Sequence, residues 1–515
     1  MNISQINDSR VKTRNTIRNV GFGIFDKIVN VVMPFVVRTI ILKQMGTEYV
    51  GLGSLFTSVL QVLSVAELGV SSAINFCLYK PISEGDENEI KDIMLLYKTI
   101  YMIVGVIILF IGISLCPIIP YCVKGSVPSD INLFVLYFIY LFNTFSSYFL
   151  FGYKHSIFIA YQRNDILNKV DLSICIIRSI LQIIILKVSC NYYLYIVLLP
   201  IFTIVSNCII NYLSFKVYPE IAEIKGYSLR GIKNISKQLE GVAIGKISLT
   251  CRNSFDSIII SSFLGLTATA IYSNYYYVIS SLGSLLSVFL VSMCASVGNS
   301  LITKSKESNQ SSHLQYDFYF QFIVTWCLMV LLGLFQDFMK LWAGEHLLVS
   351  RNTLLLFCIY FYVNNMAQVR SVYSEAAGIW WRFRLLTIGE MFLNLILNFL
   401  LGFYWGMNGI LTATIFTAFI FSFIGITLVT YNVLFGCSSK TYFLNNLFYI
   451  ITSILGCYLI NKISAFMICD RLKDLLIKGG ILGVISLMYL LLIYFCVRRT
   501  RTYLLWIREI LFSIL

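Results

Sequence analysis

The segment LKQMGTEYVGLGSLFTSV, Leu42–Val59, returns in weaker form 219 residues later as SSFLGLTATAIYSNYYYV, Ser261–Val278. Chance similarity between apolar helices is the alternative to an internal duplication. The duplication is favoured because one shift without gaps also preserves landmarks outside the segment. The shift places Gly46 on Gly265, Ser54 on Ser273, Lys27 on Lys246, Arg163 on Arg382 and Asp171 on Glu390.

The composition around these segments indicates that lipid is the solvent for most of the chain. Of its 515 residues, 58% are hydrophobic and 12% are charged, and the mean hydropathy is +0.80. Soluble domains carry about 25% charged residues. A globule of this size cannot bury so many apolar side chains, because its surface still needs polar cover.

Apolar runs predict fourteen transmembrane helices, since a helix needs about 20 mainly apolar residues to cross a bilayer. The eighth run is long enough to tilt or break. The runs are 19–42, 50–78, 99–122, 131–153, 171–190, 192–214, 241–264, 268–300, 316–339, 352–372, 385–404, 407–434, 442–461 and 477–497.

Six spans per repeat is an even number, so the two copies run in the same direction through the membrane. The expected fold is therefore an all-α, polytopic membrane protein with two parallel six-helix lobes and two further C-terminal helices. The predicted divisions are an N-terminal lobe (1–214), a cytoplasmic linker (215–240), a C-terminal lobe (241–434) and spans thirteen and fourteen with a basic tail (435–515).

The distribution of Lys and Arg predicts that both termini are cytoplasmic. With the N terminus inside, 24 of the 39 basic residues lie in inside segments, 7 lie in outside loops and 8 lie within spans. Residues 1–18 are polar and basic and have no short apolar run with a cleavage site. We therefore expect no cleaved signal peptide, and the first helix to direct insertion.

The short segments between the spans disfavour an enzyme and an ATP-driven transporter. The longest hydrophilic stretch, 215–240, leaves no room for a soluble catalytic domain. GVAIGK, Gly241–Lys246, is one residue short of a phosphate-binding loop and is followed by Ile247, where that loop needs Ser or Thr. We expect neither an enzyme nor an ATP site, and no cofactor.

Metal, disulfide and nucleic-acid chemistry are disfavoured on similar grounds. The three histidines lie far apart in sequence, and the fourteen cysteines lie mostly inside apolar runs with no CxxC pair. The net charge of +14 is spread over short loops and forms no continuous basic face. We expect no metal site, no disulfides and no nucleic-acid partner.

Four basic residues inside spans one and seven are the candidate substrate-binding residues: Lys27, Arg38, Lys246 and Arg252. Eleven residues at 100° each place Lys27 and Arg38 within about 20° of one face and about 16 Å apart. Because spans one and seven correspond in the repeat, their basic faces are expected to line one central cavity suited to an anion. The alternatives are snorkelling from the helix ends and, for Arg252, an i,i+4 ion pair with Asp256.

Carboxylates inside the spans are candidates for coupling transport to an ion, because such residues are costly in lipid and tend to face a polar interior. Span eleven adds a polar stripe of Glu390, Asn394 and Asn398. Intramembrane amides more often hold helices together than bind substrate. The candidate ion-coupling residues are Asp26, Glu67, Asp171, Asp256 and Glu390.

Two six-span lobes, the quoted segments and two extra C-terminal spans resemble Wzx-type polysaccharide flippases, which move O-antigen or capsule repeat units. These proteins belong to the multidrug/oligosaccharidyl-lipid/polysaccharide exporter (MOP) superfamily. The resemblance covers essentially the whole chain and has no diagnostic catalytic motif. Asp26–Lys27 also resembles the first-span charges of a related peptidoglycan-precursor flippase, with Lys where Arg is expected.

The resemblance implies translocation of an undecaprenyl-diphosphate-linked oligosaccharide from the cytoplasmic to the outer leaflet of a bacterial inner membrane. It also implies the bilayer, the lipid-linked substrate and polysaccharide polymerase machinery as partners. Multidrug exporters of the superfamily usually have twelve spans and carboxylate-rich cavities. They remain an alternative, as do the peptidoglycan-precursor flippase and a polytopic glycan polymerase, ligase or glycosyltransferase, although no outside loop exceeds about fifteen residues.

Overall fold

Residues 25–125, 127–224, 226–229 and 232–505 are described in a computed structural model, in which all regular structure is helical. The chain divides into two compact units between Ser273 and Asn274. We call Met1–Ser273 unit 1 and Asn274–Leu515 unit 2. Each is described by itself.

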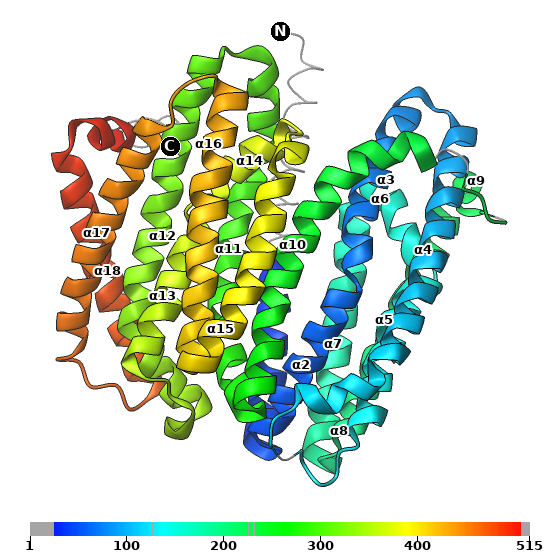
Figure 1. The fold of residues 1–515 in the computed structure, drawn as a ribbon, viewed down its shortest axis with the longest axis horizontal. Helices are drawn as coiled ribbons and strands as arrows, with labels where there is room; N and C mark the ends of the chain where they lie inside the picture. Colours follow the sequence, from blue (N-terminus) through cyan, green and yellow to red (C-terminus); the bar gives the residue numbers. More distant parts are fainter. Residues whose placement is uncertain (1–24, 126, 225, 230–231, 506–515) are drawn as a thin grey trace, which may run out of the picture. The chain divides into compact units, whose positions relative to one another are not determined.

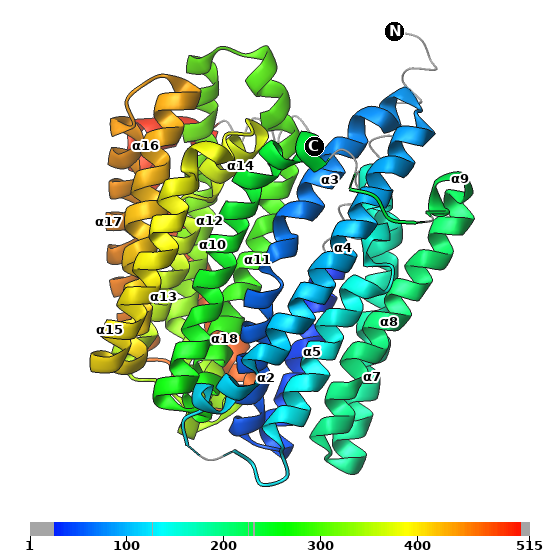
Figure 2. The ribbon, with the colours of Figure 1, turned by 45° about the vertical axis from the view of Figure 1, so that its right-hand side comes forward.

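Unit 1 begins, in its described part, with a helix over residues 25–44. The helices that follow are labelled in Figure 1, and Figure 2 turns them by 45° so that α7 and α8 are seen side by side. They are α2 (Thr47–Leu63), α3 (Val65–Glu84), α4 (Glu87–Leu115), α5 (Leu133–Phe149), α6 (His155–Ala160), α7 (Asn164–Ser189), α8 (Tyr192–Val217), α9 (Pro219–Ala222) and α10 (Ile232–Leu264).

Helix α11 (Leu266–Thr303) begins in unit 1 and continues into unit 2. The other helices of unit 2 follow it in the order of the chain. They are α12 (Lys306–Ala343), α13 (Arg351–Asn365), α14 (Gln368–Ala376), α15 (Arg384–Thr417), the π-helical turns η5 (Ala418–Gly425) and η6 (Tyr431–Phe435) on either side of α16 (Ile426–Thr430), α17 (Lys440–Ser464) and α18 (Leu472–Cys496).

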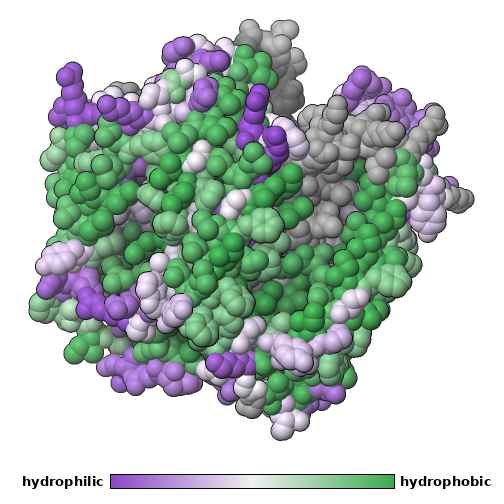
Figure 3. All heavy atoms as spheres, viewed as in Figure 1, coloured by the Kyte–Doolittle hydropathy of each residue, from purple (hydrophilic) through white to green (hydrophobic). Residues whose placement is uncertain are grey.

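Every predicted span overlaps a helix, so the expected all-α fold with about fourteen transmembrane helices is confirmed. Eight described helices are long and apolar enough to cross a membrane by themselves, or nine if the bent pair Leu133–Phe149 and Gly152–Ala160 forms one span. Figure 3 shows hydrophobic residues over the middles of the helices and hydrophilic residues mainly toward their ends.

The breaks in the spans do not fall where the sequence suggested. The eighth span, α11, runs unbroken over 38 residues, whereas the second divides at Ser64 into α2 and α3. The tenth divides between Asn365 and Gln368. Spans eleven and twelve meet at Gly406, whose φ of 58° and ψ of −136° are not helical.

The repeat has a structural counterpart at Gly46 and Gly265. Both glycines have positive φ, 112° and 89°, and each ends one span one residue before the next helix begins. Glycine adopts this conformation without the steric cost of a Cβ. Arg163 immediately precedes α7, and Arg382 lies two residues before the start of α15. The lobe boundaries taken from the repeat stay a prediction, and by packing α10 lies against α2 and α3 within unit 1.

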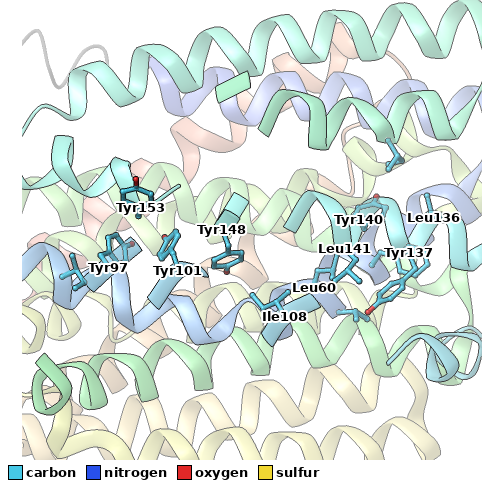
Figure 4. Packing of buried hydrophobic residues seen from close by; sticks show 14 of the residues in the cluster. Leu60, Tyr97, Tyr101, Ile108, Leu136, Tyr137, Tyr140, Leu141, Tyr148 and Tyr153 are labelled. Carbon is cyan, nitrogen blue, oxygen red and sulfur yellow. The ribbon is translucent and has the colours of Figure 1, made fainter. Parts of the chain in front are cut away.

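The core of unit 1 is rich in tyrosine, as Figure 4 shows along α4 and α5. The rings of Tyr97 and Tyr101 lie 4.5 Å apart, and Tyr101 lies 5.4 Å from Tyr148. Tyr137 donates its hydroxyl to the carbonyl of Gly112 at 2.8 Å. Tyrosine fills this interior with apolar surface while its hydroxyl finds a partner within the protein, as a helix bundle in lipid requires.

One close approach fixes the start of α11 against α2. A Cβ added at Gly51 would overlap the backbone carbonyl of Leu266. We therefore expect Gly51→Ala to destabilise the protein by about 1–3 kcal/mol through overpacking. The measurement is the thermal unfolding midpoint of the purified protein in detergent. Gly283→Ala is the matched control, since a Cβ there meets nothing within 4 Å and alanine favours a helix. Equal midpoints for Gly51→Ala and wild type would contradict the contact.

The predicted topology can be tested at two exposed loop positions, Leu229 and Phe466, which are 48% and 88% exposed. In a background without native cysteines, an impermeant maleimide added to intact cells should label Phe466→Cys and leave Leu229→Cys unlabelled. Removal of native cysteines is needed because Cys190, Cys208 and Cys496 are exposed. Labelling of Leu229→Cys as strong as that of Phe466→Cys would overturn the cytoplasmic placement of the 216–237 loop.

Candidate functional site

Arg38 is placed by the packing of its own helix within unit 1. Its neighbours Val37 and Ile41 are buried in a cluster with Leu186 of α7 and Ala270 of α11. From this position the half-buried Arg38 donates a hydrogen bond from Nη2 to Oγ of Ser273. The predicted binding residue therefore ties the first span to the first turns of α11.

A second arginine, Arg178 of α7, acts on the same tyrosine as Arg38. Both guanidinium groups lie within electrostatic range of the hydroxyl of Tyr195 on α8. The Nε atom of Arg178 is buried and has no hydrogen-bond partner among the residues that the structure describes. We call Arg38 and Arg178 the arginine pair. Two cations held near one hydroxyl repel each other. An anion between them would relieve the repulsion and would accept a hydrogen bond from the unpaired Nε of Arg178.

Tyrosines of α8 form the wall beside the arginine pair. The rings of Tyr192 and Tyr195 lie 5.5 Å apart, and Tyr192 donates its hydroxyl to the carbonyl of Tyr49 at 2.9 Å. Arg38 also lies within electrostatic range of Tyr192. The site thus offers guanidinium and hydroxyl groups, which is the donor set that binds phosphate oxygens.

The same two helices, residues 25–44 and α7, bring together two of the candidate ion-coupling residues. Asp171 lies within electrostatic range of Asp26 and of His155. Asn30 donates to Oδ1 of Asp26 at 2.9 Å. Two carboxylates near one another bind a proton or a cation more readily than either does alone.

Arg252 and Asp256 lie in the interior of unit 1, where they are 4% and 1% exposed. Arg252 donates from Nε to Oδ1 of Asn253 at 3.4 Å, and Asp256 accepts from the hydroxyl of Tyr272 at 3.0 Å. The i,i+4 ion pair stays a prediction. Since Arg252 is nearly inaccessible here, contact with a substrate would need another conformation of α10.

The remaining candidates lie apart from the arginine pair. Lys27 and Lys246 are exposed, in agreement with either snorkelling or a water-filled cavity. Glu67 lies on α3, and its side chain is outside the described residues. The cavity expected between spans one and seven stays a prediction.

Glu390 is 7% exposed and belongs to a buried polar stripe of unit 2. Asn394 donates from Nδ2 to the hydroxyls of Thr414 at 3.1 Å and Thr417 at 3.3 Å, and Asn398 donates to Oδ1 of Asn394 at 3.1 Å. The bonds from Asn394 connect spans eleven and twelve, whereas the bond from Asn398 lies within span eleven. Asn394 therefore holds two helices together, as the alternative interpretation expected.

The sequence analysis left Arg178 and Tyr195 out of the binding residues. A usable signal was present, because spans one and five each carry an aspartate followed by an arginine closer to the outside. Asp26 and Arg38 are twelve residues apart, and Asp171 and Arg178 are seven apart. Tyr195 carried no signal, because a tyrosine near a helix end resembles any other interfacial aromatic residue.

Unit 2 contains two apolar cavities, of about 630 and 530 Å³, and each is lined in part by one of the two C-terminal helices. The larger lies among α12, α13, η5 and α17, with Arg351 and Asn461 among its lining residues. The smaller lies among α11, α12 and α18. Their size and lining suit stretches of hydrocarbon chain.

Comparisons with known proteins find similarity at the level of the fold. Neither a family model nor a curated protein matches the sequence. Among solved structures, the lipid II flippase MurJ in an inward closed conformation matches with a TM-score of 0.64 and 16% identity. The match covers 92% of this chain and 98% of that chain.

Two multidrug transporters are also similar. An inward-facing MATE family transporter of the MOP superfamily matches with a TM-score of 0.55 and 13% identity, over 78% of this chain and 92% of that one. A mutant of the Vibrio cholerae MATE transporter VcmN has the same score and identity, over 81% and 95%. The chain therefore has the fold of MOP superfamily transporters, in accord with the expected superfamily.

The arginine pair can be tested by anion binding to the purified protein. We expect Arg38→Ala and Arg178→Ala each to weaken binding of pyrophosphate by about 10-fold or more, because each removes a charged donor worth about 1.5–3 kcal/mol. Titration calorimetry in detergent measures the change. Lys169→Ala is the control, since Lys169 is 67% exposed and lies 4.0 Å from Asp165 at the start of α7. Unchanged binding in both arginine variants would show that the pair holds no anion.

Proposed function

We propose that this protein is a flippase that moves a polyprenyl-diphosphate-linked oligosaccharide from the cytoplasmic to the outer leaflet of a bacterial inner membrane. The product would serve surface polysaccharide synthesis, with polymerase machinery as the next partner. The proposal joins a transporter fold to a site whose chemistry suits the charged part of such a lipid.

The observation that carries the proposal is that Arg38 and Arg178, on two predicted spans of unit 1, both lie within electrostatic range of Tyr195. A diphosphate is the costliest part of the substrate to remove from water, because its charges lose far more hydration energy than neutral sugar hydroxyls do. Guanidinium groups replace that hydration with bidentate, charge-assisted hydrogen bonds.

The apolar cavities beside α17 and α18 support a lipid-linked substrate over a water-soluble one. Each is large enough to hold part of a prenyl chain while the glycan passes through a polar path. The two helices also distinguish this chain from transporters with twelve spans. In keeping with this, the match to the flippase covers a larger share of the chain than the matches to the multidrug transporters.

For the mechanism we propose that spans one to six rock against spans seven to twelve around a central cavity, as parallel repeats with a central site permit. Asp26 and Asp171 would couple the motion to a cation, because they lie within electrostatic range of one another on the two helices that carry Arg38 and Arg178. The hydrogen bond from Arg38 to Ser273 would break when the diphosphate takes the guanidinium.

Two alternatives within the fold class are a peptidoglycan-precursor flippase and a multidrug exporter. A peptidoglycan-precursor flippase would also need a cationic site for its diphosphate, and its substrate would differ in the glycan. The second is less well supported, because the arginine pair would repel cationic drugs. A polytopic glycan polymerase or glycosyltransferase stays a weaker alternative, since the longest hydrophilic stretch, 215–240, is short for a soluble catalytic domain.

Complementation tests the proposal directly. The protein is expressed in a strain that lacks its O-antigen or capsule flippase, and surface glycan is measured. We expect wild type to restore export and Arg38→Ala and Arg178→Ala to abolish it at normal expression. Arg38→Lys should retain part of the activity, because a point charge survives although the bidentate fork is lost.

The control and the alternatives use the same variants. Lys169→Ala should export at the wild-type level. Rescue of a strain depleted of its lipid II flippase, without rescue of surface glycan, would favour the peptidoglycan branch. Raised drug resistance without either rescue would favour the multidrug branch. Export at the wild-type level by both Arg38→Ala and Arg178→Ala would contradict the cationic-site mechanism.

A further inference from the structure

A polar stripe runs along one face of α12 through the interior of unit 2. Its members recur every four residues, and each is at most 1% exposed. They are His313, Asp317, Gln321 and Thr325. Helix α17 packs against α12 and presents Asn446 and Ser453, which are 1% and 3% exposed. Asn446 donates from Nδ2 to Oδ2 of Asp317 at 3.2 Å, and the hydroxyls of Thr325 and Ser453 lie 2.9 Å apart.

Hydrogen bonds fix the orientation of both amide groups beside Asp317. The Nδ2 atom of Asn446 also donates to the carbonyl of Tyr442 at 3.1 Å. The Nε2 atom of Gln321 donates to the carbonyl of Met366 at 3.1 Å. Reversing either amide would place its oxygen against another acceptor, so both oxygens must point the other way.

As a result, three buried acceptor oxygens have no donor among the residues that the structure describes. They are Asp317 Oδ1, Gln321 Oε1 and Asn446 Oδ1. Orphaned acceptors cost free energy in a dry interior, and a carboxylate costs the most. Since all three are oxygens and only one group carries a formal negative charge, a small cation of charge +1 would suit them.

We propose that Asp317, Gln321 and Asn446 form a buried site for one monovalent cation, a proton or Na⁺. The site is separate from the carboxylates assigned above to ion coupling, and it stands whether or not the chain moves a polyprenyl diphosphate. A divalent ion is disfavoured, because one carboxylate would leave it with an excess positive charge in a buried site.

Other titratable groups around the site include one carboxyl, Glu390, which lies within electrostatic range of Arg370, and Arg499, which lies within range of Tyr431 and Tyr449. On α12 itself, His313 Nδ1 lies 3.1 Å from the hydroxyl of Tyr431. Arg370 of α14 lies within electrostatic range of His313. The tyrosines within electrostatic range of Asp317 come from α13, η6 and α17, and they are Tyr362, Tyr431, Tyr442 and Tyr449. Asp317 is therefore the group whose charge a bound cation would balance.

Gln321 connects the site to the break in the tenth span by a hydrogen bond. Both Gln321 Nε2 and the hydroxyl of Tyr442 donate to the carbonyl of Met366, which lies between α13 and α14. A cation bound to the oxygen of Gln321 would hold the amide that closes this break. Broken helices of this kind are where transporters often bind coupling ions. Occupancy of the site would thus change the stability of the broken span.

Thermal unfolding of the purified full chain tests the proposal. The midpoint is measured in NaCl and in N-methylglucamine chloride at equal ionic strength, each from pH 5.5 to 8.5. If Na⁺ is the ligand, NaCl should raise the wild-type midpoint by about 3 °C or more at fixed pH. If the proton is the ligand, the midpoint should fall as the pH rises in the absence of Na⁺, because the bound ligand is removed.

Asp317→Asn should lose whichever response wild type shows, because the amide removes the charge and supplies its own donor. Glu345→Gln is the matched control and should keep the response, since Glu345 is 73% exposed and pairs with Lys340 at 2.9 Å. If Asp317→Asn does not fold, Gln321→Met should weaken the response. A wild type that responds to neither ion, or an Asp317→Asn variant that responds as wild type does, would overturn the proposal.

Discussion

Lipid offers no hydrogen bonds, so every polar group within the membrane must find its partner inside the protein. Much of the irregular structure follows from this constraint. Where α10 ends, Lys124 donates from Nζ to the carbonyl of Phe263 at 2.7 Å and from its backbone to the carbonyl of Ser261 at 3.1 Å. Where the tenth span breaks, Gln321 and Tyr442 cover the carbonyl of Met366. Breaks are tolerated where a second helix supplies donors.

The same constraint makes a cluster of unsatisfied groups informative. Among the described residues, the unpaired group near Tyr195 is one arginine donor, Nε of Arg178, whereas the unpaired groups near Asn446 are oxygen acceptors around a single carboxylate. An unpaired donor favours an anion, and unpaired acceptors favour a cation. This difference leads to the two opposite ligands proposed above.

The sequence predicts features of this structure that extend over many residues better than it predicts local ones. Apolar runs of about 20 residues located all fourteen spans, because transfer to lipid sums over the whole run. The break at Ser64 was missed, since one turn of non-helical backbone hardly changes hydropathy.

The candidate site was predicted less completely than the spans were. Arg38 was identified from its face, but its neighbour Arg178 depends on how α7 packs, which periodicity within one helix does not contain. The α12 stripe at Asp317 has the same four-residue spacing as Glu390, Asn394 and Asn398, and could have been found by the same criterion.

The anion site proposed for unit 1 and the cation site proposed for unit 2 would influence one another only through conformational equilibria that both ligands bias. Covalent continuity offers one such element. Helix α11 is unbroken from Leu266 to Thr303, and Arg38 holds Ser273, the last residue of unit 1, in its early turns. An anion that takes the guanidinium away from Ser273 removes a restraint from a helix that continues into unit 2.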